Sequence, residues 1–276
     1  MDARKKKWVD SYADALTFIK SEVAAGASFP RIASALHARS LSGLFSAEKA
    51  AIMGVAERYG YSTVQQPHMG LMNPVRTDFC SELHSAFLQH ILAAHVLPDI
   101  DAVFEIGSGL GFDLVGLAAR NPTTPFYGGE IAPSGREALR QLAVAARLEN
   151  VTPVPFDIEV PDFSFLSGKN VLVFSHFALV YANPFPRDFF PRLLDTVADA
   201  HVVLFEPVSF ELAGQMSEPA RFTAERARLY GICDHLLAVV RELGSQGKIV
   251  VEEVVPDISG RSGVNAVSLV RFRKTR

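Results

Sequence analysis

From Ile100 onward, apolar runs of strand length alternate with runs of helical periodicity, and this alternation constrains the fold more than any other feature of the sequence. The expected strands lie at 102–106, 126–128, 151–156, 170–174 and 201–205. The expected helices lie at 110–119, 135–148 and 189–198. Such alternation is typical of a parallel sheet with helices on both faces.

The end of the chain follows a different pattern. Apolar runs at 248–255 and 264–272 are separated by a connection rich in glycine and serine, with no helix between them. Strands joined in this way pair antiparallel. We therefore expect an α/β protein with a Rossmann-like, doubly wound sheet of seven strands whose last strand is antiparallel.

The first third of the chain is expected to be helical. Helical periodicity occupies 8–23, 31–37, 46–60 and 78–96. The segment 65–75 holds two prolines and a glycine, which predicts a loop. The sequence thus divides into a helical region, 1–96, and a sheet domain, 97–276.

Composition excludes several classes of function. The chain has 276 residues, is 49% hydrophobic and carries a net charge of -3, so bulk binding to nucleic acid is not expected. The basic cluster at 4–7 is expected to be a solvated face. No apolar stretch reaches the roughly 18 residues that span a bilayer, and no signal peptide pattern is present, so we expect a cytoplasmic protein without a membrane segment. Cys80 and Cys233 form no CxxC pair and are expected to be buried apolar residues.

Three glycines, Gly107, Gly109 and Gly111, lie between the first expected strand and the first expected helix. Glycines at this junction allow a tight turn and bring bare backbone close to a ligand at a helix N-terminus. In the dinucleotide fingerprint the third glycine falls five residues after the first, a position that Phe112 occupies here. A pyrophosphate site is therefore disfavoured.

An acidic residue, an apolar residue and a GxGxG loop after the first strand resemble the first motif of class I S-adenosylmethionine-dependent methyltransferases. The resemblance covers about residue 97 to the C-terminus. It implies S-adenosylmethionine as the cofactor, with the loop, Ser108 included, beneath its methionine and ribose. It also implies that Glu105 lies near the methionine amino group.

The same resemblance implies further cofactor residues after the second, third and fourth strands. Glu130 would hold both ribose hydroxyls, since one carboxylate accepts two hydrogen bonds. Ile131 directly follows it, and Ser175 follows the fourth strand. Asp157 would meet the adenine amino group. The candidate walls for the adenine ring flank Asp157 and are Phe156 and Ile158. Taken alone, Glu130 is equally suited to cap a helix and Asp157 to begin a turn.

His176 is the candidate catalytic residue. It follows the fourth strand, where ligands bind in open parallel sheets. An oxygen nucleophile usually needs a base, and an imidazole can accept a proton near neutrality. A histidine that is only hydrogen-bonded within the wall of the site remains the alternative.

Asn183 begins a sequence, Asn-Pro-Phe-Pro, that invites comparison with the NPPF/Y-type motif of enzymes that methylate amino groups of bases. The adjacent prolines of that motif are missing here, and the segment stands well beyond its strand. The two prolines more simply open a loop. N-methylation of a nucleoside or nucleic acid stays an alternative function.

Other polar residues could face the site. Glu206 and Glu211 follow the fifth strand and could lie at the mouth or cap a helix. His68, Asn73 and Arg76 stand in the expected loop and could close over a substrate. The histidines show no metal-ligand spacing, so no metal is expected.

The expected function is methylation of a small molecule, with the helical region covering the cofactor and shaping the substrate pocket. The segment 265–270 faintly resembles the ending of sugar O-methyltransferases, with Ala266 in place of a proline. O-methylation of a sugar or a natural-product intermediate is therefore favoured. A non-catalytic, cofactor-binding adaptor is the alternative from another class, and a homodimer remains open.

Overall fold

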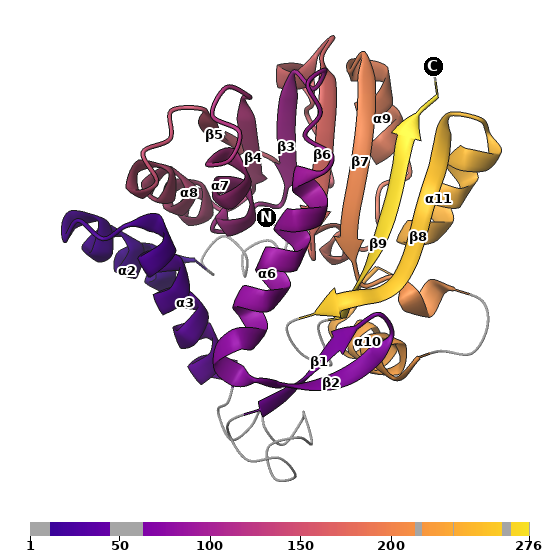
Figure 1. Cartoon of the computed structure of the whole chain (residues 1–276). Helices are drawn as coiled ribbons and strands as arrows, with labels where there is room; N and C mark the ends of the chain where they lie inside the picture. Colours follow the sequence, from indigo (N-terminus) through magenta and orange to yellow (C-terminus); the bar gives the residue numbers. More distant parts are fainter. Residues whose placement is uncertain (1–11, 45–62, 213–216, 234, 261–265, 276) are drawn as a thin grey trace.

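The computed structural model describes residues 12–44, 63–212, 217–233, 235–260 and 266–275 (Figure 1). Its seven-stranded sheet has the order β5-β4-β3-β6-β7-β9-β8. The strands are β3 (Ala102–Ile106), β4 (Phe126–Glu130), β5 (Val151–Pro155), β6 (Asn170–His176), β7 (Asp199–Glu206), β8 (Ile249–Gly260) and β9 (Ala266–Lys274). Strands β3 to β7 are parallel, whereas β9 pairs antiparallel with both β7 and β8. The expected Rossmann-like sheet with an antiparallel last strand is confirmed.

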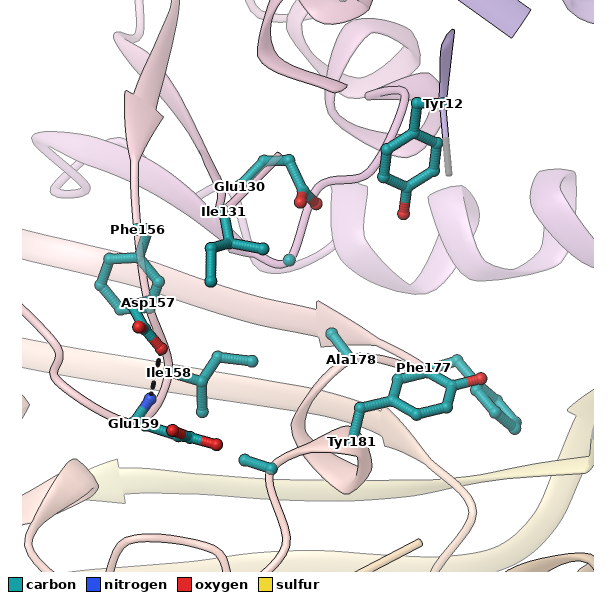
Figure 2. A pocket seen from close by; sticks show the side chains of 12 residues that line it. Tyr12, Glu130, Ile131, Phe156, Asp157, Ile158, Glu159, Phe177, Ala178 and Tyr181 are labelled. Atoms are coloured by element: carbon teal, nitrogen blue, oxygen red, sulfur yellow. Dashed lines mark hydrogen bonds between the residues drawn. The ribbon is translucent and has the colours of Figure 1, made fainter. Parts of the chain in front are cut away.

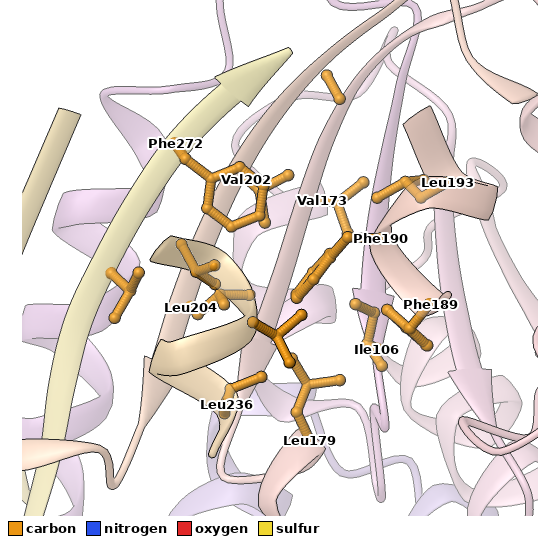
Figure 3. Packing of buried hydrophobic residues seen from close by; sticks show 14 of the residues in the cluster. Ile106, Val173, Leu179, Phe189, Phe190, Leu193, Val202, Leu204, Leu236 and Phe272 are labelled. Carbon is orange, nitrogen blue, oxygen red and sulfur yellow. The ribbon is translucent and has the colours of Figure 1, made fainter. Parts of the chain in front are cut away.

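Helices cover both faces of this sheet. They are α7 (Phe112–Ala118), α8 (Pro133–Ala145), α9 (Phe189–Thr196) and α11 (Leu236–Ser245). A further helix, α10 (Glu218–Tyr230), lies beyond one end of the sheet rather than on a face (Figure 1). Because successive strand residues point to opposite faces, Val173 and Leu204 pack with Phe190 of α9 and Leu236 of α11 (Figure 3). Phe174, one residue along from Val173, packs on the opposite face with α7 and α8. The central strands β3, β6 and β7 are therefore buried on both sides, as their continuous apolar runs predicted.

Three N-terminal helices extend the second face. They are α2 (Ala13–Ala24), α3 (Phe29–Leu44) and α6 (Thr77–Ala93). Ile19, Ile32 and Leu88 are fully buried in the same cluster as Leu114 of α7. The helical region thus shares a hydrophobic core with the sheet, and its division from the sheet at residue 96 stays a prediction. The helix expected at 46–60 and the basic cluster at 4–7 lie outside the described residues.

The loop expected at 65–75 is wrong, because the chain forms a hairpin there. Its strands are β1 (Thr63–His68) and β2 (Leu71–Arg76). Met69 and Gly70 both have positive φ and make the two-residue turn. Pro67 and Pro74 both stand in non-hydrogen-bonded pairs of this register. Their missing N–H groups therefore remove no hydrogen bond between the two strands. The amides of Met69 and Gly70 then dock on the carbonyls of Ile258 and Asp257 in β8.

Several element ends also differ from expectation. α7 begins at Phe112 rather than residue 110, because Gly111 has a φ of 87° and cannot belong to the helix. α8 begins early at Pro133, whose fixed φ suits a first turn. β8 continues to Gly260, into the expected turn. Neither α10 nor α11 was predicted. The described residues also form three short 3₁₀ turns, η1 (Ser164–Leu166), η2 (Leu179–Tyr181) and η3 (Ser209–Glu211). Within the described residues, every helix is too short or too polar to cross a membrane.

Candidate functional site

The glycine loop after β3 is closely packed by its neighbours. Gly107, Gly109 and Gly111 all have positive φ, a region that side chains other than glycine rarely adopt. A Cβ on Gly107 would lie 2.5 Å from the Cβ of Ala178, and one on Gly111 would lie 2.3 Å from a methyl of Leu139. The loop therefore needs glycine both for its backbone angles and for the space beside it.

Glu130, the last residue of β4, is bonded to this loop. Its Oε2 accepts a hydrogen bond from the Gly109 amide at 2.9 Å, and its Oε1 accepts one from the Ala132 amide at 2.8 Å. Burial raises the pKa of the Glu130 carboxyl, while these amides act to lower it. Each oxygen keeps lone-pair capacity for a further donor.

A cleft opens at the carboxyl ends of β3, β4, β5 and β6 (Figure 2). The space within it is about 780 Å³ when the solvent at its open mouth is included. Six of the residues predicted at the cofactor line it: Gly107, Glu130, Ile131, Phe156, Asp157 and Ile158. Four strands far apart in the sequence thus contribute to one cleft, as expected from their order.

The remaining predicted residues lie outside the cleft lining. Ser108 donates its backbone N–H to the Gly129 carbonyl at 2.9 Å, so it secures the loop to β4. Gly109 and Gly111 belong to the glycine loop but do not line the cleft. Ser175 is fully buried and does not line the cleft.

Glu105 lies beneath the glycine loop and is almost completely buried. Burial raises the pKa of its carboxyl well above the ordinary value, and the nearby charge of Asp113 adds to the effect. The Leu114 amide in the first turn of α7 acts in the opposite direction by hydrogen bonding. Among the described residues, Glu105 Oε2 has no hydrogen-bond partner. A buried acceptor of this kind is unfavourable until a donor reaches it.

Asp157 both lines the cleft and begins a turn, so the two roles considered for it coexist. Its Oδ1 accepts the Glu159 amide at 3.0 Å. Phe156 packs edge-on against Phe104 at 5.0 Å between ring centroids. The apolar side of the cleft is therefore supported by the core behind it.

Sequence reasoning missed several residues of the lining. Tyr12, at the start of α2, reaches the cleft from the N-terminal region, and Phe177 and Tyr181 come from the segment after β6. No local pattern links Tyr12 to the glycine loop, because only packing brings α2 against α8. The aromatic residues after His176 were visible in the sequence, and their position after a parallel strand was the signal that could have assigned them.

Glu206, at the end of β7, holds that aromatic segment in place. Its Oε1 accepts the amides of Ala178 and Leu179, both at 3.0 Å. Phe177, with a φ of 54°, is held in an uncommon backbone conformation at this turn. Burial raises the pKa of the Glu206 carboxyl against the opposing effect of these amides. Glu206 thus acts as a cap rather than a residue at the mouth.

Glu211 is likewise a cap. Its Oε2 accepts the Leu237 amide at 2.8 Å at the start of α11. Burial raises the pKa of the Glu211 carboxyl to about 7. Other polar residues considered earlier are also structural: Asn183 Nδ2 donates to the Gly231 carbonyl at 2.8 Å, and His68 and Asn73 belong to the hairpin rather than to the cleft lining. For Arg76, only its place at the end of β2 is described.

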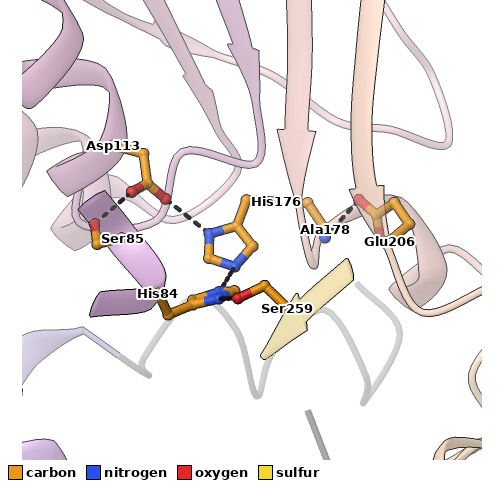
Figure 4. Close-up of polar contacts among 7 residues, drawn as sticks. All are labelled: His84, Ser85, Asp113, His176, Ala178, Glu206 and Ser259. Atoms are coloured by element: carbon orange, nitrogen blue, oxygen red, sulfur yellow. Dashed lines mark hydrogen bonds and ion pairs between the residues drawn. The ribbon is translucent and has the colours of Figure 1, made fainter. Parts of the chain in front are cut away.

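His176 lies at the end of β6 in a chain of polar side chains (Figure 4). Its Nδ1 is 2.7 Å from Asp113 Oδ2, and its Nε2 is 3.0 Å from His84 Nε2. Asp113 also accepts the Ser85 hydroxyl at 2.9 Å, and His84 Nδ1 is 2.8 Å from Ser259 Oγ. The structure therefore brings two histidines together that the sequence placed on separate elements.

Comparison with protein-family models gave no match, and neither did comparison with curated protein sequences. Solved structures do match. One is a geranyl diphosphate C-methyltransferase from Streptomyces coelicolor A3(2) in complex with Mg²⁺, geranyl diphosphate and S-adenosyl-L-homocysteine, with 14% identity, a TM-score of 0.52 and coverage of 72% of this chain and 82% of that one. Another is the mitomycin 7-O-methyltransferase MmcR, with 15% identity, a TM-score of 0.50 and coverage of 72% and 56%. The chain has the fold of these methyltransferases.

Proposed function

We propose that the protein is an S-adenosylmethionine-dependent methyltransferase that acts on a small molecule. The observation that carries the proposal is the cleft at the carboxyl ends of β3 to β6, where Glu130, bonded to the glycine loop, faces apolar walls (Figure 2). Ligands of open α/β sheets bind at this edge. The fold shared with S-adenosylmethionine-dependent enzymes supports the same cofactor.

The residues of the cleft fit the parts of this cofactor. Glu130 has lone pairs for both ribose hydroxyls, beyond the two amides it already accepts. Ile131, Phe156 and Ile158 would contact the adenine ring, and the Asp157 carboxylate would accept a hydrogen bond from its amino group. When bound, the cofactor supplies a methyl group on a positively charged sulfur.

Glu105 provides a second test of fit. Its buried Oε2 has no partner among the described side chains and backbone, and burial raises the pKa of the carboxyl. An ammonium group beneath the loop would satisfy this oxygen and stabilise the ionised form. The methionine part of S-adenosylmethionine carries such a group, whereas an adaptor kept only for its shape has no physical need for an unsatisfied buried carboxylate.

For the acceptor, we propose a hydroxyl group on a sugar or a natural-product intermediate. His176 is the proposed base, and Asp113 would stabilise its charged form from 2.7 Å. The chain's slightly negative net charge disfavours a nucleic-acid substrate. Small acceptors are also named for proteins of this fold, geranyl diphosphate and mitomycin among them.

Transfer of a labelled methyl group to a panel of sugars, natural-product intermediates and nucleosides tests the proposal. Methylation of a hydroxyl in one of the first two classes is the expected result. The matched control is Glu149→Ala, an exposed carboxylate outside the cleft lining, which should methylate like the wild type. Cofactor binding without transfer to any acceptor would favour the adaptor, and transfer to a base amino group would favour the N-methyltransferase.

A further inference from the structure

Ser85, Asp113, His176, His84 and Ser259 form one continuous chain of side-chain hydrogen bonds. They come from α6, α7, β6 and β8, so four elements converge on it (Figure 4). His84 is 1% exposed, and Ser259 is 3% exposed. Buried polar groups of this kind depend on their hydrogen-bond partners, because each lost contact leaves an unsatisfied group in the interior.

The proton positions in this chain follow from the carboxylate at one end. An ionised Asp113 only accepts, so His176 Nδ1 carries a proton and, in neutral His176, Nε2 is an acceptor. His84 Nε2 must then donate to it across 3.0 Å, which leaves His84 Nδ1 to accept the Ser259 hydroxyl at 2.8 Å. The hydrogen bonds from Ser259 through His84 and His176 therefore all donate toward Asp113, which accepts the Ser85 hydroxyl from the other side.

This arrangement has a consequence for the base. The lone pair of His176 that could take a proton from an acceptor hydroxyl is already used by His84. Direct transfer would first have to break a buried hydrogen bond. Ser259 Oγ lies at the other end of the chain and keeps a lone pair that can accept.

We propose, on the basis of the methyltransferase function above, that the acceptor's proton leaves through Ser259 and His84, and that His176 with Asp113 stores it. As the O–CH₃ bond forms, the acceptor O–H bond breaks and its proton passes to Ser259 Oγ. The Ser259 hydroxyl proton moves to His84 Nδ1, and the His84 Nε2 proton moves to His176 Nε2. The chain ends with a neutral His84 and an imidazolium at His176 beside the Asp113 carboxylate.

The same geometry couples the protons of the two histidine rings. If both rings were charged, two N–H groups would point at each other across the 3.0 Å contact, so the pair can hold one added proton but not two. The carboxylates near His176 are Asp113 from α7, whose Oδ2 is 2.7 Å from Nδ1, and Glu206 from β7. Ser85 and Ser259 face the two ends as neutral hydroxyls.

Nitrogen-15 NMR of histidine-labelled protein tests the pair without any turnover. We expect His176 as the Nδ1–H tautomer and His84 as the Nε2–H tautomer, and we expect the two rings to take up a single shared proton. Independent protonation of both rings, or an Nε2–H tautomer at His176, would overturn the proposal. His90→Gln, an exposed histidine on the same helix, is the matched control and should leave these signals unchanged.

Turnover supplies the second test. His84→Gln should lower kcat by about 10²-fold or more and shift the acid limb of its pH profile, while cofactor affinity stays near wild type. In mixtures of light and heavy water, a plot of the wild-type rate against the fraction of heavy water should be curved, because several protons move together. A linear dependence would contradict the relay. Absent cofactor binding would instead mean that the methyltransferase proposal has failed, so the two failures are distinguishable.

Discussion

The Gly107 Cα lies so close to Ala178 that a Cβ built on the glycine would come within 2.5 Å of the alanine Cβ. The loop after β3 and the segment after β6 are therefore in direct contact at the cleft. Glu206 holds the second of these segments by accepting the Ala178 amide. The shape of the cleft consequently depends on two strand ends and on a carboxylate from a third strand.

Gly107→Ala should destabilise the protein by about 1–3 kcal/mol, because it combines a positive φ with an overpacked contact. Ala178→Gly in the same chain should recover part of this loss by removing the methyl group that is contacted. Urea denaturation of both single variants and the double variant measures the coupling. Strictly additive losses would mean that Ala178 is not the neighbour that requires glycine at 107.

Tyr12→Ala should weaken cofactor binding by about tenfold, which is the effect expected when one aromatic wall of a cleft is removed. Tyr12→Phe keeps the ring and should lose less. Calorimetric titration with S-adenosylmethionine compares the three proteins. Equal affinity in all three would remove the N-terminal region from the cofactor site.

Glu211→Gln should change how stability depends on pH. Burial raises the pKa of the Glu211 carboxyl from its ordinary value of 4.5 to about 7, so the folded state binds this proton more tightly than the unfolded state. The protonated Glu211 carboxyl therefore adds to the free energy of unfolding below about pH 4.5, and this contribution is lost as the pH rises through 7. The loss is of the order of 1–3 kcal/mol.

Thermal unfolding between pH 4.5 and 7 measures this effect. Glu211→Gln should flatten the decline in stability over that window, since the amide cannot ionise. Glu218→Gln, an exposed glutamate in the first turn of α10, is the control and should keep the wild-type slope. An unchanged slope in Glu211→Gln would assign the decline to other groups.

Much of the fold could be predicted because its signals are local. Apolar runs of strand length, glycines at a strand-to-helix junction and acidic residues at strand ends can each be read within about ten residues. The hairpin at Met69 was missed because its prolines suggested a loop. Whether a proline removes a hydrogen bond between the strands depends on the pairing register, which the sequence does not give. α10 was missed because its sequence is predominantly polar.

The part of the site that was predicted is the part determined by the order of the parallel strands. Glu130, Phe156 and Asp157 line one cleft because parallel strands end at the same edge of the sheet. Tyr12 and the contact between His84 and His176 depend on how N-terminal helices pack on that sheet. No spacing along the chain encodes such contacts, so only the folded structure reveals them.

Calorimetric titration of S-adenosylmethionine and S-adenosylhomocysteine tests the central claim most directly. Both should bind the wild type in a roughly micromolar range, and Glu130→Ala should weaken both about equally, by about 1.5–3 kcal/mol, because the ribose hydroxyls are common to the two ligands. Circular dichroism would verify that the variant is folded. Absence of binding to the wild type, or unchanged affinity in folded Glu130→Ala, would contradict the assignment of this cleft to the cofactor.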